Sequence, residues 1–439
     1  MSSQPTILCF EDAAVQRLAP VVTARPAYAI SCASHRLIDW LRHLNLPILA
    51  DCRPHLRAIQ KLDFSIDQAP TASPMPCPTL FVNARLVPSP RIFKLLSEIV
   101  RNAQPIVIRD GEGTVAVAYL ATPDATDAAD SVPITTDAGT FSAVSTTEPM
   151  QWSPALEQRI ARLAASLPAS DRIAETFKWP NDIVYHHMRT MDEAMQWRIT
   201  NGQYTQLQDG VFVSEGAMIG QYPVIDTSKG PIIIERDVKV GPFCFLAGPV
   251  HIGAGSRIIE HSALKDAVAL GHTTKVGGEV EASVIEPFTN KQHHGFLGHS
   301  YLGSWINLGA GTCNSDLKNT YGTINMDYGT DKVATEMQFM GCIMGDYSKT
   351  AINTGIFTGK VIGVCSMLYG FVTSNVPSFV NYARLFGQTA TLPPEVMIST
   401  QARMFARRKV QQRECDQQLI FDMFDLTEEE RNLQAAIGL

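Results

Sequence analysis

Aliphatic side chains recur at every sixth position through the middle of the chain, between residues 234 and 276. A period of six matches neither the 3.6-residue period of an α-helix nor the simple alternation of a strand. It is typical of a hexapeptide β-helix, in which each hexad supplies a short strand and a turn around one inward side chain. The eight inward positions that this pattern predicts are Ile234, Val240, Leu246, Ile252, Ile258, Leu264, Leu270 and Val276.

The hexads are interrupted, and binding groups of a solenoid usually lie on the segments that leave it. The pattern starts near residue 210, breaks at residues 222–230 as a predicted loop, and breaks again at residues 286–295. Residues 314–333 are polar and out of register, which predicts a projecting loop, and a last run of hexads covers residues 344–368.

Mixed α/β patterning precedes the hexads and predicts a separate domain. Its predicted strands are residues 6–10, 78–82, 106–109 and 115–120. Its predicted helices are residues 34–44, with Ser34 as the N-cap, and residues 153–167. Residues 121–147 are rich in Ala, Asp, Thr and Ser and predict a loop or a weakly ordered insert.

The tail after residue 393 is helical in pattern. Residues 395–424 predict one long helix, and Thr427 with the acidic residues after it predicts the start of a short last helix. The long helix carries a basic cluster, which fits either a solvated face or contact with an anion: Arg403, Arg407, Arg408, Lys409 and Arg413. The predicted organisation is an α/β domain at 1–190, a linker at 191–210, a β-helix at 211–385 and a helical tail at 386–439.

Composition and charge narrow the class of protein. The chain has 439 residues and a net charge of −7, so it lacks the general basic footprint of a nucleic-acid-binding protein. No apolar run is long enough to span a bilayer, and the first residues lack the pattern of a signal peptide. Nine scattered cysteines without a CxxC pair fit a reducing cytoplasm, where we expect the protein.

Three histidines, His293, His294 and His299, lie at the second interruption of the hexads. Histidine is the natural general base near neutral pH. A metal site is the other reading of three histidines, but no Asp, Glu or Cys lies within the cluster to complete one, and we predict no metal there. The nearby polar groups Asn307 and Lys318 are suited to orienting a sugar phosphate.

Arg25 in the segment VVTARPA is the candidate nucleotide-binding residue of the first domain. It fits contact with a nucleotide phosphate, or simply a surface position before a proline-fixed turn. The chain has no GxxxxGK[ST] or GxGxxG motif, and no Gly-rich segment follows the first strand. This absence weakens a prediction of nucleotidyl transfer.

The hexads together with NKQHHGFLGHSYLGSWINLGAGTCNSDLKN resemble the GlmU-type family, in particular a divergent bacterial branch. Members of that family are bifunctional N-acetylglucosamine-1-phosphate uridylyltransferases and glucosamine-1-phosphate acetyltransferases. The resemblance is strong over residues 211–368 and weak outside them. It implies a Rossmann-like α/β nucleotidyltransferase-like domain followed by a left-handed parallel β-helix, and a trimer with active sites between subunits.

The resemblance also implies roles for individual residues. An ungapped count back from NLGAGT puts the family's catalytic base at His293, with His294 and His299 as alternatives. Gly309, Ala310 and Gly311 would contact coenzyme A, and a backbone N–H there would stabilise the oxyanion. The implied substrate-binding residues are Lys265, Asn307, Asn314, Lys318 and Tyr301.

The chain departs from the family at three of these positions. Lys265 stands where the family has Arg, which keeps the charge and loses the bidentate geometry. A second phosphate-binding lysine is missing near Ala282, and Lys291 is the candidate replacement. The substrate-contacting tyrosine aligns with Phe296, so Tyr301 is the nearby substitute. These changes concern the acceptor sugar more than the acyl transfer.

The predicted function is transfer of acetyl from acetyl-CoA to an amino-sugar phosphate such as glucosamine 1-phosphate, in UDP-N-acetylglucosamine and cell-envelope precursor synthesis. Mg²⁺ is implied only if the first domain is an active uridylyltransferase. The alternatives are a sugar-1-phosphate nucleotidyltransferase whose β-helix serves assembly, and a non-enzymatic nucleotide-sugar-binding protein. No nucleic acid or membrane partner is expected.

Overall fold

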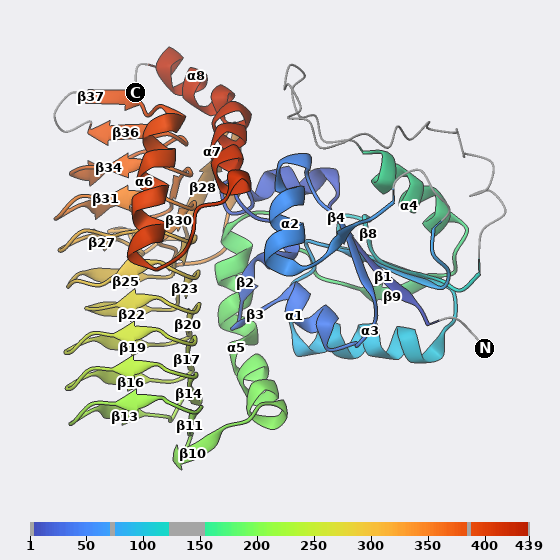
Figure 1. The fold of residues 1–439 in the computed structure, drawn as a ribbon, viewed down its shortest axis with the longest axis horizontal. Helices are drawn as coiled ribbons and strands as arrows, with labels where there is room; N and C mark the ends of the chain where they lie inside the picture. Colours follow the sequence, from blue (N-terminus) through green and yellow to red (C-terminus); the bar gives the residue numbers. More distant parts are fainter. Residues whose placement is uncertain (1–3, 71–74, 123–153, 384–387, 438–439) are drawn as a thin grey trace.

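The structure is a computed structural model that describes residues 4–70, 75–122, 154–383 and 388–437. It consists of an α/β domain beside a tall β-helix, with three C-terminal helices packed at the upper end (Figure 1). The predicted insert at 121–147 falls almost entirely outside the described residues. No helix in the described ranges is long and apolar enough to cross a membrane.

The N-terminal domain is built on a seven-stranded sheet in the order β5-β4-β1-β6-β8-β7-β9. β1, β4 and β6 are parallel, and β8 runs antiparallel to both β6 and β7. All four strands predicted in this domain are present. The strands are β1 (Thr6–Phe10), β4 (Ile48–Asp51), β5 (Asp67–Gln68), β6 (Thr79–Asn83), β7 (Ile106–Arg109), β8 (Val115–Leu120) and β9 (Ala169–Ile173), with a separate pair β2 (Ser31–Cys32) and β3 (His35–Arg36).

Five α-helices accompany this sheet: α1 (Leu37–Arg42), α2 (Arg57–Phe64), α3 (Pro90–Asn102), α4 (Ala155–Ala165) and α5 (Asn181–Asn201). The helix predicted at 153–167 corresponds to α4. The prediction of Ser34 as an N-cap is wrong, because α1 begins at Leu37 and Arg36 with Asp39 forms its capping box. Ser34 instead adopts a left-handed backbone conformation, with φ of 73°.

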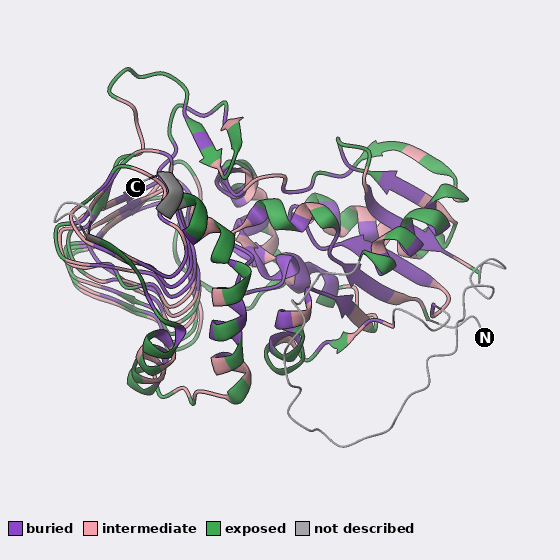
Figure 2. Cartoon of the chain, turned by 90° about the horizontal axis from the view of Figure 1, so that it is seen from above, coloured by how far each residue is buried: buried purple, intermediate pink, exposed green. Residues whose placement is uncertain are grey.

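The C-terminal part is a parallel β-helix with three faces, seen end-on in Figure 2. Face 1 follows the antiparallel strand β10 (Thr205–Gln208) and consists of β11 (Val211–Val213), β14 (Ile232–Ile234), β17 (Val250–Ile252), β20 (Val268–Leu270), β23 (Val284–Ile285), β26 (Tyr301–Leu302), β30 (Cys342–Met344) and β33 (Lys360–Ile362). Face 2 consists of β12 (Met218–Ile219), β15 (Lys239–Val240), β18 (Arg257–Ile258), β21 (Lys275–Val276), β24 (Asn290–Lys291), β31 (Lys349–Thr350), β34 (Met367–Leu368) and β36 (Val380–Ala383), to which β37 (Gln388–Thr391) adds antiparallel. Face 3 consists of β13 (Val224–Asp226), β16 (Phe245–Ala247), β19 (Ala263–Lys265), β22 (Glu279–Glu281), β25 (Phe296–Gly298), β27 (Cys313–Asn314), β32 (Gly355–Ile356) and β35 (Phe371–Val372).

All eight predicted inward side chains are buried in one apolar cluster inside the β-helix, so the hexad prediction is confirmed. One predicted interruption is wrong. Residues 222–230 contain β13, which pairs in register with β16 and continues face 3. The polar segment at 314–333 leads into a hairpin of β28 (Asn325–Tyr328) and β29 (Asp331–Ala334). Tyr328 of this hairpin stacks on Trp179 of the N-terminal domain, with 5.2 Å between ring centroids.

The predicted single helix at 395–424 is two helices, α6 (Pro394–Arg407) and α7 (Glu414–Leu426). The chain turns between them because Lys409 has a left-handed backbone conformation and Arg413 with Asp416 forms a new capping box. Phe405 of α6 packs on Trp305 of the β-helix, with 4.3 Å between ring centroids. The short last helix is confirmed as α8 (Glu428–Ile437).

The N-terminal domain packs on face 1, and the two parts share one apolar cluster that includes Ile183 of α5 and Ala269 and Ile343 of face 1. His187 of α5 bonds the carbonyl of Ala267 at 2.7 Å. Burial lowers the pKa of His187 to about 4, so this contact is made by a neutral imidazole. Helix α5 spans Asn181–Asn201 and therefore runs without a break across the domain border predicted at residue 190. The border itself stays a prediction. Most candidate residues lie on faces 2 and 3 or at their corners, whereas Tyr301 lies on face 1.

Candidate active site

The tandem histidines lie at the corner between face 2 and face 3, in the turn from β24 to β25. His293 and His294 are both exposed. The carbonyl of His294 accepts the amide of Gly311 at 3.0 Å, so the Gly309–Gly311 segment lies on the same corner one coil further along. The structure therefore brings the predicted base His293 near the predicted coenzyme A segment.

Lys291 lies inside this corner and not on its surface. Its side chain is 2% exposed, and Nζ donates to the carbonyls of Gly277, His293 and Gly295 at 2.7, 2.9 and 2.7 Å. Fifteen residues separate Val276 from Lys291, against eighteen between Ile258 and Val276, and this shorter coil puts Lys291 in the inward column. The prediction that Lys291 replaces the missing phosphate ligand is therefore wrong, because its buried ammonium already donates hydrogen bonds to three carbonyl groups.

His299 lies at the next corner, between face 3 and face 1, and has a carboxylate partner. Its Nδ1 is 2.8 Å from Oδ2 of Asp316, and both side chains are mostly buried. The ring also stacks on Phe339, with 5.2 Å between centroids. Such a carboxylate fixes the imidazole's orientation and tautomer and leaves Nε2 free for proton transfer. Asp316 was missed in the sequence because it lies outside the histidine cluster, between Asn314 and Lys318.

The other candidates near His299 are arranged around face 3. Lys265 lies in one column with Glu281 and Gly298 on successive strands. It forms ion pairs with Glu279 at 2.9 Å and Glu281 at 3.4 Å, and these two carboxylates raise its pKa. Binding a phosphate would require the positive charge of Lys265, but the two paired carboxylates already offset that charge.

Asn314 and Lys318 differ in their availability. Asn314 is 4% exposed, and its side-chain amide accepts the Gly298 amide and donates to the Gly298 carbonyl. It therefore holds the backbone beside His299. The Lys318 ammonium donates to the carbonyl of Thr323 at 2.6 Å and is half-buried. No carboxylate within the described part of the chain forms an ion pair with Lys318.

The Gly309–Gly311 segment has one amide left for an oxyanion. The Gly309 amide donates to Thr350, and the Gly311 amide donates to His294. Among the described residues, none accepts the amide of Ala310. Asn307 lies on face 2, where it bridges β24 and β31 and its Oδ1 accepts from Asn290 at 3.3 Å.

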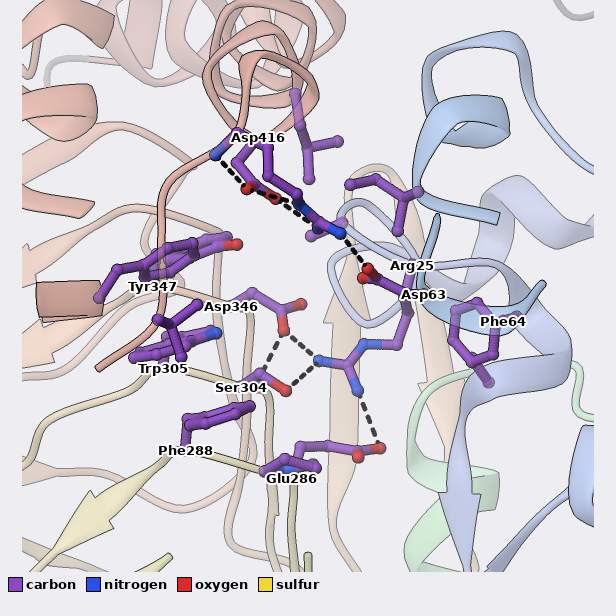
Figure 3. A pocket seen from close by; sticks show the side chains of 18 of the residues that line it. Arg25, Asp63, Phe64, Glu286, Phe288, Ser304, Trp305, Asp346, Tyr347 and Asp416 are labelled. Carbon is purple, nitrogen blue, oxygen red and sulfur yellow. Dashed lines mark hydrogen bonds and ion pairs between the residues drawn. The ribbon is translucent and has the colours of Figure 1, made fainter. Parts of the chain in front are cut away.

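Tyr301 and Arg25 lie elsewhere, between the N-terminal domain and face 1. Tyr301 is fully buried, and its hydroxyl donates to Glu286 at 2.7 Å. Arg25 forms ion pairs with Glu286 at 3.0 Å and with Asp346, and it also donates to Ser304 (Figure 3). Burial would lower the pKa of Arg25, but the nearby anionic groups, Asp346 first, raise it well above its usual value. Both residues lie in the junction between the two parts. The Tyr301 hydroxyl and the two terminal nitrogens of Arg25 have protein partners, whereas the buried Nε of Arg25 has no hydrogen-bond partner among the described residues.

A cavity of about 450 Å³ opens beside Arg25, between the N-terminal domain, the β-helix and the C-terminal helices. Figure 3 shows Trp305 and Tyr347 on one side, Phe64 on the other and Arg25 between them. Each guanidinium on its wall has a carboxylate partner: Arg25 with Asp346, Arg36 with Asp39, and Arg413 with Asp63 and Asp416. This pairing leaves little net positive charge for a nucleotide phosphate.

The carboxyl ends of β1 and β6 are where an open α/β sheet usually binds its ligand. Here Asp12 and Glu11 follow β1, and both are buried in ion pairs, Asp12 with Arg85 at 2.6 Å and Glu11 with Arg53 at 2.9 Å. No group of three or more potential metal ligands occurs among the described residues. The carboxylates in this arrangement do not fit a Mg²⁺ site, because arginines already neutralise them.

Comparison with known proteins places these features in a family context. Residues 7–201 match the family model described as "Sugar nucleotidyl transferase". A bifunctional sugar-1-phosphate nucleotidylyltransferase/acetyltransferase of Sulfurisphaera tokodaii is 28% identical over 181 residues, 41% of this chain and 44% of that protein. The bifunctional protein GlmU of Cupriavidus pinatubonensis is 31% identical over 121 residues, 27% of this chain and 26% of that protein. These matches support a GlmU-like family, as the motifs predict.

The alignments span less than half the length of these two relatives. The family model covers the N-terminal domain, where the sequence resemblance was weak. A solved structure, the polySia specific acetyltransferase NeuO, aligns over 46% of this chain and 99% of that chain at 14% identity. Its TM-score is 0.20, so the alignment carries no argument. The β-helix of this chain is shown by its own strand pairing.

Proposed function

We propose that the chain transfers an acetyl group from acetyl-CoA to the amino group of an amino-sugar phosphate, such as glucosamine 1-phosphate. The observation that carries the proposal is the pairing of His299 with Asp316 at an edge of the β-helix. Lys318, two residues after Asp316, supplies a cation without a carboxylate partner in the described structure. The name of the Sulfurisphaera tokodaii relative, which pairs nucleotidyl transfer with acetyl transfer, supports the same activity.

In this mechanism the amine of the acceptor attacks the thioester carbonyl of acetyl-CoA. Nε2 of His299 takes the proton from the attacking nitrogen, and Asp316 stabilises the imidazolium that forms. The C–S bond then breaks, and the proton passes to the departing thiolate. Lys318 binds the phosphate of the acceptor and holds the amine in position. The amide of Ala310 lies at the other corner, beside His293, so it would stabilise the oxyanion only if His293 is the base.

His293 is the competing choice for the base, on the strength of the family resemblance. Its side chain is exposed, whereas His299 is oriented by a carboxylate and an aromatic ring.

Thiol release from acetyl-CoA with glucosamine 1-phosphate would be measured for His299→Ala and His293→Ala. We expect a loss of about 10² or more for His299→Ala and a small effect for His293→Ala. His261→Ala, an exposed histidine on face 3's border that stacks on Phe243, is the matched control. The reverse order of effects would assign the base to His293.

Uridylyl transfer by the N-terminal domain is the second candidate function, favoured by the match of residues 7–201 to sugar nucleotidyl transferases. The ion pairs of Asp12 and Glu11 oppose it. The test is pyrophosphate release from UTP and N-acetylglucosamine 1-phosphate with Mg²⁺. Absence of release at high protein concentration would leave this domain as the cover of face 1, with the acetyl transfer unaffected.

A trimer with shared active sites is part of the proposal, and it rests on the family resemblance. Faces 2 and 3 are available for such contacts, since the N-terminal domain packs on face 1. Light scattering of the purified chain is the direct measurement. A monomer with full acetyl transfer would contradict shared active sites and leave the chemistry at His299 standing.

A further inference from the structure

Cations gather on face 2 of the β-helix without carboxylate partners. Arg257 of β18 and Lys275 of β21 are directly paired on adjacent strands, whose spacing is about 4.8 Å. The end of α6 adds Arg407 and Arg408 to the same place, because Arg408 donates to the side chain of Asn290, the strand neighbour of Lys275. We call these four residues, Arg257, Lys275, Arg407 and Arg408, the face 2 cation cluster.

The electrostatics of the cluster are one-sided. Burial and then repulsion by Arg408, Arg257 and Arg407 lower the pKa of Lys275. Burial and then Arg407 lower the pKa of Arg408. No carboxylate within the described ranges contributes to either group. Like charges held together at this distance destabilise the folded chain, and an anion bound among them would relieve that repulsion.

We propose that the face 2 cation cluster binds the linked phosphates of a nucleotide-type ligand, a pyrophosphate diester. Two of the cations come from neighbouring strands and two from a helix end. Together they cover a larger area than one phosphate group occupies, which favours two linked phosphates. The side chains are accessible, since Arg257 and Arg407 are exposed and Lys275 and Arg408 are half-buried. The chain as a whole carries a charge of −7, so a local positive patch favours a small anion over a nucleic-acid polymer.

The cluster lies near the corner that holds His293 and Ala310. Asn290 pairs with Asn307 on the next coil, and Ala310 lies three residues beyond Asn307, at most about 10 Å along extended chain. A ligand with its pyrophosphate on the cluster therefore has its remaining part within reach of the corner of His293 and Ala310. Coenzyme A and a UDP-sugar both carry a pyrophosphate diester, and the experiment distinguishes them. The site itself does not depend on the proposed acetyl transfer.

The test is isothermal titration of the full chain with CoA, dephospho-CoA, UDP-N-acetylglucosamine and inorganic pyrophosphate. We expect Arg257→Ala with Lys275→Ala to weaken binding of the preferred ligand by about tenfold or more, the effect of losing charge-assisted hydrogen bonds. The matched control is Lys94→Ala with Lys332→Ala, which removes the same charge from exposed positions elsewhere. Added salt should weaken binding to the wild type more than to the double variant.

Equal affinity of the wild type and the double variant would overturn the inference, as would no binding of any of these ligands at millimolar concentration. A change in oligomeric state of the double variant with unchanged affinity would assign the cations to contact with a second copy, which also overturns it. His299→Ala separates this inference from the proposed function. It should abolish acetyl transfer and leave pyrophosphate binding intact.

Discussion

Nδ1 of His299 lies 2.8 Å from Oδ2 of Asp316, although seventeen residues and one coil of the β-helix separate them. The backbone reinforces this pairing, because the amide of Met340 donates to the Asp316 carbonyl and the amide of Gly341 donates to the His299 carbonyl. The return of the chain after the β28–β29 hairpin therefore holds both residues in place.

Asp316→Asn is the sharpest variant for this pair, because it keeps the shape of the side chain and removes its charge. We expect acetyl transfer to fall about 10- to 100-fold, since the imidazolium formed during proton transfer loses its stabilising anion. The KM for acetyl-CoA should change little, because Asp316 acts through His299. Thiol-release kinetics measure both quantities. A change confined to KM would make Asp316 a substrate-binding residue.

Arg25→Ala should destabilise the fold more than a change in a binding residue would. It leaves the buried carboxylates of Glu286 and Asp346 without their cation. The expected loss in the free energy of unfolding is about 3–5 kcal/mol, measured by urea denaturation. Arg172→Ala, which breaks an exposed ion pair with Glu98, is the control and should cost about 1 kcal/mol or less. Near-equal losses would mean that the Arg25 contacts contribute little to joining the two parts.

Lys291 gives the stability of the chain a defined pH dependence. Burial lowers its pKa from 10.5 to about 8, so between these values the unfolded chain binds more protons than the folded chain. Stability therefore rises with pH through this range, as the buried ammonium loses its charge. The free energy of unfolding of the wild type, minus that of Lys291→Met, should increase by about 3 kcal/mol between pH 7.5 and 10.5. A difference independent of pH would show that Lys291 stays charged throughout.

Cys313 should be the first thiol to react with a disulfide reagent. It is exposed, whereas six of the other cysteines are buried and Cys77 and Cys415 are half-buried. Burial raises the pKa of Cys32 and Cys342 to about 12, which suppresses their thiolates further. Cys313→Ser should remove the fast phase of labelling. Cys313 lies three residues after Ala310, so bound acetyl-CoA should slow the labelling of Cys313 in proportion to the fraction of protein that holds the coenzyme. An unchanged labelling rate would argue against coenzyme binding at Ala310.

The sequence by itself determined the β-helix. Every sixth residue from Ile234 to Val276 must be apolar because each faces the same narrow interior, and that requirement is visible along the chain. Four strands of the N-terminal sheet, β1, β6, β7 and β8, were also readable, because buried strands are continuous apolar runs, whereas β4, β5 and β9 were not predicted. The prediction of a single helix in the tail was wrong, because the chain turns at Lys409, which has a left-handed backbone conformation, and a new helix is capped at Arg413.

Only the tertiary structure decided what the outward side chains meet. One shortened coil turned Lys291 inward, and the stacking of coils set Asp316 beside His299. Packing of the N-terminal domain on face 1 took Tyr301 and Arg25 into the junction with that domain. The inward positions obey a local period, whereas outward partners depend on coil length and on which face another element covers. Both of these are set by contacts between residues far apart in the chain.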